Sequence, residues 1–214
     1  MYTCYGFFST AWKESAARIV KEENKSKYYN SVYKDMSRFL KAVTIGLIAI
    51  MPFAFPILID KGYNDAYVYI PILAIAIYYT CVSNFFGGIF AAYKDTKVMG
   101  YTTVASAIIN IIINFALLNK LKIYAATFST LIANIVVYIY RLIKLKKHIK
   151  LKQKIDFIYW ILMIITLISY YYNNIITNII MFIIVLGYCV ITNKKMIGVF
   201  ISKIKGMSIK EVKS

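Results

Sequence analysis

The chain has 214 residues, of which 60% are hydrophobic and only 16% are charged, and its formal net charge is +17. A soluble domain is about half apolar and about a quarter charged, so this composition argues against a soluble enzyme and against a disordered basic tail. A nucleic-acid-binding domain would account for the charge but not for the apolar mass, and we therefore expect an all-α integral membrane protein.

The first 41 residues divide into an apolar and a basic part. Residues 1–12 (MYTCYGFFSTAW) are apolar but too few to cross a bilayer, which needs about 20 residues. We expect either a partial transmembrane helix, whose beginning is missing, or an interfacial helix with Trp12 at headgroup depth. In residues 13–41 apolar side chains recur at three- and four-residue steps, which predicts a cytoplasmic amphipathic loop leading into the first full span.

Stretches without charge predict the transmembrane helices, because a charge at the bilayer centre costs roughly 2.5–3.5 kcal/mol on insertion scales. Uncharged stretches of 18, 28, 22, 18 and 37 residues lie in turn between Lys41 and Asp60, Asp65 and Lys94, Lys97 and Lys120, Lys122 and Arg141, and Asp156 and Lys194. The first four predict one helix each. The fifth is too long for one helix and has Asn173 and Asn174 near its middle, which predicts a hairpin of helices 157–172 and 175–192. Residues 42–192 then form a six-helix transmembrane lobe, and residues 193–214 form a basic cytoplasmic tail.

The basic residues supply an independent test of this topology, because loops rich in Lys and Arg stay in the cytoplasm. With six spans, 23 of the 26 basic residues lie on one side, and only Lys61, Lys120 and Lys122 lie on the other. A single span over residues 157–192 would instead place the basic tail outside. We therefore predict six spans with both termini cytoplasmic. Retention of basic loops in the cytoplasm and their attraction to anionic lipid headgroups account for the positive charge, so no nucleic-acid partner is expected.

Prolines and glycines within the predicted spans are candidate hinges. Pro52 and Pro56 lie in the first span, Pro71 begins the second, and Gly87 and Gly88 follow later in the second. Proline removes a helical hydrogen bond, and in a transporter such a position allows bending between states. Prolines are also common in membrane helices generally, and glycines allow close helix packing, so both interpretations remain open.

Polar side chains within the spans are candidates for lining a substrate cavity, since a polar face turns away from lipid. We select Asn84, Asn110, Asn114, Asn134 and Thr127. Asn110 and Asn114 lie on one helix face, one turn apart. Thr127 and Asn134 also share a face, two turns apart. Hydrogen bonding between helices explains the same positions and is the open alternative.

Charged and reactive groups are sparse inside the spans. Asp60, Asp65, Asp95 and Asp156 all lie at span ends, and Arg141 follows the fourth span, where we expect it to snorkel to the headgroups. A cation-coupled antiporter normally needs a buried carboxylate. No phosphate-binding glycine loop, metal-ligand spacing or catalytic triad is present, so we expect no cofactor, no metal and no enzymatic activity.

Four segments carry a resemblance to a known family: FSTAWKESAARI at 8–19, YVYIPIL at 67–73, YKDTKVMGYTTVASAIINIIINFALL at 93–118 and YAATFSTLIANIVVYIYR at 124–141. In order and spacing they resemble the C-terminal half of the polysaccharide-biosynthesis oligosaccharide flippases, members of the multidrug/oligosaccharidyl-lipid/polysaccharide exporter superfamily. The positions that match the family pattern are Lys94, Lys97, Asn110, Asn114, Ala126 and Thr127. The chain departs from the pattern after Trp12, where the family often has a proline and Lys13 and Glu14 stand here.

The resemblance implies one lobe of a two-lobe transporter in the bacterial cytoplasmic (inner) membrane. It implies that the substrate is an undecaprenyl-diphosphate-linked oligosaccharide for O-antigen, lipopolysaccharide or capsule-type export, moved by alternating access through a cationic cavity between the lobes. The partners would be the lipid bilayer, the lipid-linked oligosaccharide and a missing N-terminal lobe. Two alternatives remain: a drug or cation exporter of the same superfamily, which the lack of buried acids disfavours, and a non-transporting scaffold or inactive remnant.

Overall fold

The computed structural model describes residues 2–152 and 156–198. Within these ranges the chain is helical and contains no β-strand. The elements are α1 (Tyr2–Ile19), α2 (Lys25–Leu58), the 3-10 segment η1 (Lys61–Tyr69), α3 (Ile70–Ala92), α4 (Lys97–Leu121), α5 (Ile123–Leu145), α6 (Phe157–Tyr172) and α7 (Ile175–Thr192).

Among the residues that the structure describes, five helical segments are long and apolar enough to cross a membrane, namely Lys25–Leu58, Gly62–Ala92, Lys97–Leu121, Ile123–Leu145 and Ile175–Thr192. These segments confirm the expected class, an all-helical chain with several apolar helices that suggest a multi-pass membrane protein. α6 is apolar too, but it has 16 residues. At ~1.5 Å per residue it spans about 24 Å, somewhat less than the ~30 Å hydrocarbon core of a bilayer.

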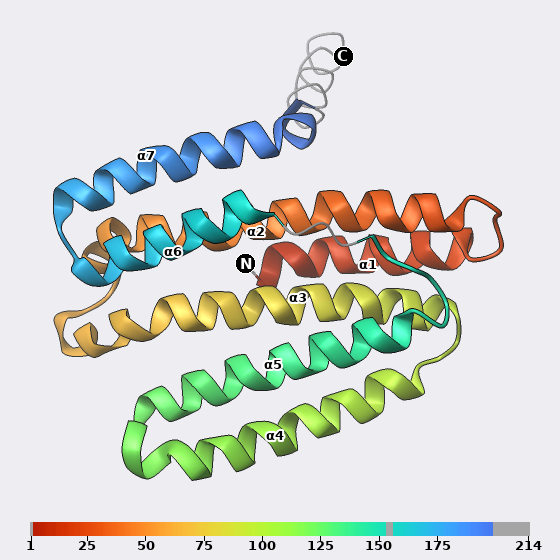
Figure 1. The fold of residues 1–214 in the computed structure, drawn as a ribbon, viewed down its shortest axis with the longest axis horizontal. Helices are drawn as coiled ribbons and strands as arrows, with labels where there is room; N and C mark the ends of the chain where they lie inside the picture. Colours follow the sequence, from red (N-terminus) through yellow and green to blue (C-terminus); the bar gives the residue numbers. More distant parts are fainter. Residues whose placement is uncertain (1, 153–155, 199–214) are drawn as a thin grey trace, which may run out of the picture.

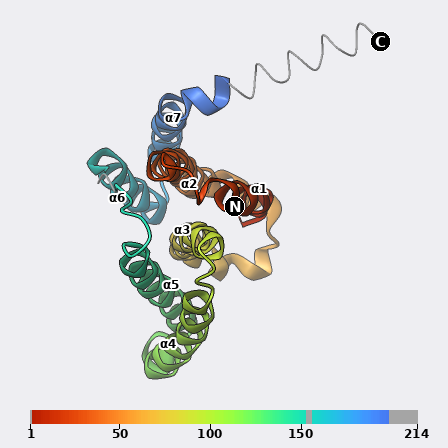
Figure 2. The same ribbon diagram turned by 90° about the vertical axis from the view of Figure 1, so that its right-hand side faces the viewer.

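The helices run side by side, and their connections alternate between two ends of the bundle (Figure 1). The α1–α2 and α3–α4 connections and the end of α5 lie at one end, which we call the basic end because Lys- and Arg-rich segments gather there. The α2–α3, α4–α5 and α6–α7 turns lie at the other. Seen from the basic end, α3 lies centrally, and α4 and α7 lie on opposite outer sides (Figure 2).

The helices near the N-terminus extend across the predicted segment boundaries. α1 continues past Trp12, and α2 includes most of the segment predicted as an amphipathic loop. Tyr29, Met36 and Leu40 are buried on one side of α2, whereas Lys34 and Arg38 are exposed on the other. The amphipathic pattern therefore extends the first membrane helix beyond its apolar part. One face of this extension packs against the bundle, while the charged side chains on the opposite face stay exposed.

Trp12 joins α1 to α3. Its side chain is 2% exposed, stacks on the Phe85 ring with centroids 4.2 Å apart, and donates its indole N–H to the Phe85 carbonyl at 3.0 Å. A Cβ atom added at Gly88 would lie 2.5 Å from Trp12 Nε1, and one at Gly87 would lie 2.9 Å from Met99 Cε. Both glycines therefore permit close packing of other elements on α3. Their role as hinges stays a prediction.

The prolines occupy two different environments. Pro52 and Pro56 lie inside α2, which continues to Leu58. Pro71 lies in the first turn of α3, where its missing N–H removes no hydrogen bond of the helix. Bending at Pro71 would therefore occur at the junction of η1 and α3 and not within α3. The hinge roles of Pro52 and Pro56 stay predictions.

The α6–α7 hairpin has the predicted helix bounds, and its turn follows from two asparagines. Asn173 adopts the left-handed conformation (φ 52°, ψ 34°), which asparagine tolerates better than most residues. The Asn174 side chain caps α7 by accepting a hydrogen bond from the Ile176 N–H at 2.9 Å. Local chemistry at these two positions is sufficient to end one helix and begin the next.

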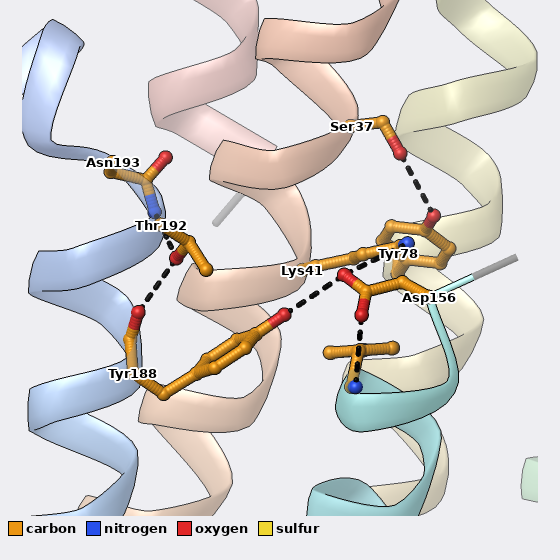
Figure 3. A network of polar contacts seen from close by, with 8 residues as sticks. Ser37, Lys41, Tyr78, Asp156, Tyr188, Thr192 and Asn193 are labelled. Carbon is orange, nitrogen blue, oxygen red and sulfur yellow. Dashed lines mark hydrogen bonds and ion pairs between the residues drawn. The ribbon is translucent and has the colours of Figure 1, made fainter. Parts of the chain in front are cut away.

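A polar network at the start of α6, beside the middle of α2, holds this hairpin in place (Figure 3). The Asp156 carboxylate caps α6 by accepting from the Tyr159 N–H at 3.2 Å, and it accepts from the Tyr188 hydroxyl of α7 at 3.1 Å. Lys41 Nζ of α2 lies 3.9 Å from the same carboxylate. One side chain thus connects three helices at the level where the apolar part of α2 begins.

Candidate functional site

A cavity of about 500 Å³ lies between α3, α4 and α5, and we call it the α3–α5 cavity. Nine of its twelve lining residues carry a polar side chain, although the three helices are apolar in composition. The lining residues are Thr80, Ser83, Asn84, Thr102, Thr103, Ser106, Ala107, Asn110, Ile111, Asn134, Val137 and Arg141. Polar groups within membrane helices are costly unless they meet polar partners, so this cavity is suited to water or to a polar ligand.

Arg141 is the charged group of this cavity, and it is only 4% exposed. Its Nε donates to Thr102 Oγ1 at 2.9 Å, Nη1 donates to the Ser83 carbonyl at 3.0 Å, and Nη2 donates to Thr103 Oγ1 at 3.5 Å. The guanidinium therefore joins α3, α4 and α5. This position corrects the expectation that Arg141 snorkels to the headgroups: hydroxyl and carbonyl oxygens of two other helices solvate the charge inside the bundle.

The charge of Arg141 is not neutralised by the part of the chain that the structure describes. The ion pairs found there join Lys41 to Asp156 and His148 to Asp95, and neither involves Arg141. A guanidinium has five N–H donors, and three are used in the contacts above. Two N–H groups, one on Nη1 and one on Nη2, remain for a ligand. Such a planar pair of donors matches an oxyanion such as a carboxylate or phosphate.

Two polar side chains of the cavity wall lack a hydrogen-bond partner among the described residues. Ser83 Oγ is buried without a hydrogen bond among the described residues. Asn84 is half-buried and forms no side-chain hydrogen bond in the same ranges. Because a buried polar atom without a partner costs about 1–3 kcal/mol, Ser83 Oγ favours water or a ligand in the cavity. The Asn84 amide is available to the same ligand.

Asn110 and Asn134 line the cavity but are engaged in helix packing. Asn110 Nδ2 donates to Thr130 Oγ1 at 3.1 Å, and its Oδ1 accepts from Ser129 Oγ at 3.1 Å, both on α5. Asn134 Nδ2 donates to the Ala76 carbonyl of α3 at 3.2 Å. These bonds favour the packing interpretation for the amides of Asn110 and Asn134, which also form part of the cavity wall.

The other two predicted residues lie outside the cavity wall. Asn114 Oδ1 is buried without a partner among the described residues. Thr127 is 5% exposed and donates to the Tyr124 carbonyl of its own helix at 3.0 Å. The structure therefore brings together Asn84, Asn110 and Asn134, and leaves Asn114 and Thr127 apart from them.

Sequence reasoning missed Arg141, Ser83, Thr102 and Thr103 as members of one site. A signal for Arg141 was present, because Asn134 and Arg141 are seven residues apart and so share a helix face two turns apart. Thr102 and Thr103 carried no such signal. Each is one of many hydroxyl residues in the chain, and only the approach of α4 to α5 gives it a role.

The titratable residues do not gather around the cavity. Within residues 2–152 and 156–198, no group of three His, Cys, Asp or Glu side chains is placed to hold a metal ion. His148 lies at the basic end, where its Nε2 is 2.9 Å from Asp95 Oδ2 and its ring stacks on Tyr93. This pair connects the α3–α4 turn to the segment after α5.

No family profile, curated protein or solved structure matches the chain. The class of the molecule is therefore the one that its own fold defines. Its described residues are helical, and they include five helices long and apolar enough to cross a membrane, with a cavity lined by polar residues among three of the helices. The similarity to oligosaccharide flippases stays a hypothesis that rests on the order of its sequence segments.

Proposed function

We propose that the chain is a C-terminal lobe of a flippase that moves undecaprenyl-diphosphate-linked oligosaccharides across the bacterial cytoplasmic membrane. The observation that carries the proposal is Arg141, a buried cation with unused N–H donors in a cavity of hydroxyl and amide groups. A guanidinium pairs with two phosphate oxygens at once, and hydroxyl and amide groups suit a glycan.

In this proposal α2 to α7 are six spans, and the basic end of the bundle faces the cytoplasm with both termini. The excess of Lys and Arg at that end supports the orientation. α6 crosses as the shortest span, which a slight local thinning of the bilayer accommodates. A second lobe outside this sequence covers the open side of the α3–α5 cavity, and α4, in which Thr102 is the one buried residue, leaves room for it.

The mechanism is alternating access without covalent chemistry. Arg141 holds the diphosphate, while Ser83 and Asn84, whose side chains lack partners among the described residues, contact the glycan. Asn110 and Asn134 keep the three helices together around the substrate. Bending at Pro52 and Pro56 of α2 would change which end of the cavity is open.

Binding to the purified chain tests the proposal. Fluorescent undecaprenyl-diphosphate oligosaccharide is titrated in detergent, and its transfer across vesicles is then measured with the chain reconstituted. Arg141→Gln should weaken binding about 10- to 100-fold, as expected for the loss of a charge-assisted contact. Lys144→Gln is the matched control, since it removes one charge from an exposed position of the same helix. Equal binding by both variants would contradict the proposal.

The two alternatives predict different results in the same assay. A drug or cation exporter would bind a cationic dye in preference to the diphosphate, although an unneutralised arginine in the cavity disfavours this. A scaffold would bind neither ligand, and Arg141→Gln would change only its stability. The hydrogen bonds of Asn110 and Asn134 between helices are the observation that favours a scaffold.

A further inference from the structure

A second surface lies far from the α3–α5 cavity, between the middle of α2 and the end of α7. It is an apolar groove of about 400 Å³ whose walls include Phe39 and Val43 of α2, Val190 of α7, and Asn193 and Met196 just beyond α7. α7 and α4 lie on opposite outer sides of the bundle, so the groove and the cavity are separate (Figure 2). Its volume falls within the ~300–1,000 Å³ of ordinary ligand sites.

The groove, which we call the α2–α7 groove, continues into a cationic hollow of about 220 Å³ that shares Asn193 and Met196 with it. The wall of this hollow carries Arg38, Lys194 and Lys195 against one carboxylate, Asp35. None of these three cations forms an ion pair with another described residue. An apolar groove beside an excess of positive charge matches an anionic lipid, in which an acyl chain is joined to a phosphate.

Asn193 lies where the apolar and cationic parts meet. Its side chain is 8% exposed, and its Oδ1 is buried without a hydrogen bond in the described part of the chain. Its Nδ2 donates to the Cys189 carbonyl at 3.1 Å and contacts Thr192 Oγ1 at 3.2 Å, as Figure 3 shows for Thr192. The Cys189 carbonyl oxygen can only accept a hydrogen bond, so the side-chain atom of Asn193 that faces it is the NH₂ group and not the oxygen. The oxygen is thus left to accept from a ligand hydroxyl.

We propose that the α2–α7 groove binds one anionic glycerophospholipid with a hydroxylated headgroup, of which phosphatidylglycerol is the simplest. An acyl chain lies against Phe39, Val43 and Val190. The phosphate lies between Arg38 and Lys194, and a headgroup hydroxyl donates to Asn193 Oδ1. The inference requires a membrane protein but does not depend on the proposed flippase activity.

The test is native mass spectrometry of the purified full chain, titrated with lipids that share the same acyl chains. Phosphatidylglycerol should bind with one molecule per chain and about tenfold more tightly than phosphatidylcholine, whose headgroup carries no net charge. Phosphatidylethanol keeps the phosphate charge but lacks the hydroxyl groups, and should bind at an intermediate level. Asn193→Leu should abolish the difference between phosphatidylglycerol and phosphatidylethanol.

Two variants probe the two halves of the site. Arg38→Gln with Lys194→Gln and Lys195→Gln should weaken phosphatidylglycerol binding at least about tenfold. Lys146→Gln with Lys147→Gln and Lys150→Gln removes the same charge from exposed positions after α5 and should leave it unchanged. Val43→Phe fills the apolar part and should weaken binding with all charges in place. Circular dichroism establishes that each variant is folded.

Three outcomes would overturn the proposal. Equal binding of phosphatidylcholine and phosphatidylglycerol would show that charge does not select the ligand. Equal losses in the two triple variants would show a general surface effect. Displacement of the lipid by inorganic phosphate, with no effect of Val43→Phe, would show a simple anion site without an acyl chain.

Discussion

The Tyr188 hydroxyl donates a 3.1 Å hydrogen bond to Asp156 Oδ2, although 32 residues separate the two along the chain. The bond joins the end of α7 to the beginning of α6, and Lys41 of α2 lies beside it. The α6–α7 hairpin is apolar, and apolar contacts are non-directional, so they alone would not fix its position along α2. A directed polar contact at one end sets its position along the bundle.

Removing this contact should loosen the hairpin. Tyr188→Phe should lower the free energy of unfolding by about 1 kcal/mol, and Asp156→Ala by about 2 kcal/mol, because the latter also removes the cap of α6. Unfolding in mixed detergent micelles, followed by circular dichroism, measures both. Tyr172→Phe is the control, since Tyr172 is 72% exposed. Strictly additive effects in the double variant would indicate that the two side chains do not interact.

Gly88 should tolerate no side chain while Trp12 is present. Gly88→Ala places a methyl group 2.5 Å from Trp12 Nε1, and should destabilise the fold by about 1–3 kcal/mol through overpacking. Gly100→Ala is the matched control, because nothing lies within 4 Å of its added Cβ and alanine favours a helix by about 1 kcal/mol. Thermal unfolding compares the two. If Trp12→Ala does not relieve the cost of Gly88→Ala, the clash is not its cause.

Asn110 and Asn114 should respond differently to leucine. Asn110→Leu removes the bonds to Ser129 and Thr130 and should destabilise the packing of α4 on α5 by about 1 kcal/mol. Asn114→Leu removes a buried oxygen that has no partner among the described residues, and should be neutral or stabilising. Chemical denaturation of both variants, combined with the ligand titration, separates packing from binding. A loss of binding without a loss of stability in Asn110→Leu would favour a direct role in the cavity.

The turn between α6 and α7 should depend on the left-handed conformation of Asn173. Asn173→Gly should preserve or slightly increase stability, whereas Asn173→Val should reduce it by about 1–2 kcal/mol, because a β-branched residue clashes in that conformation. Tyr172→Val is a control at a neighbouring exposed helical position. Equal effects of Asn173→Gly and Asn173→Val would show that the turn adopts another conformation in the membrane.

The sequence was sufficient to predict the apolar helices from residue 42 onward and the α6–α7 turn. Charge is excluded from a membrane interior over about 20 residues, so uncharged stretches mark helices without knowledge of their neighbours. The turn at Asn173 and Asn174 follows from the chemistry of those residues alone. The amphipathic pattern before residue 42 predicts helical character, but it does not predict that this segment continues as one helix with the apolar part.

The candidate site could be predicted only in part. Helical spacing places Asn84, Asn110 and Asn134 on polar faces, but it does not say which faces meet. Asn114 lies on the same helix face as Asn110, one turn further along, and yet is outside the cavity wall. The pairing of helix faces depends on contacts between residues distant in sequence, and no local pattern encodes it.

Arg141 marks the division between the two kinds of information. As a charge at the end of an apolar stretch, Arg141 indicates a span boundary in the sequence, since an unsolvated cation in lipid is costly. The tertiary structure places Thr102 and Thr103 of α4 and the Ser83 carbonyl of α3 around its guanidinium. Local physics thus decided where helices form, and only the assembly of three helices decided that a charge could be buried among them.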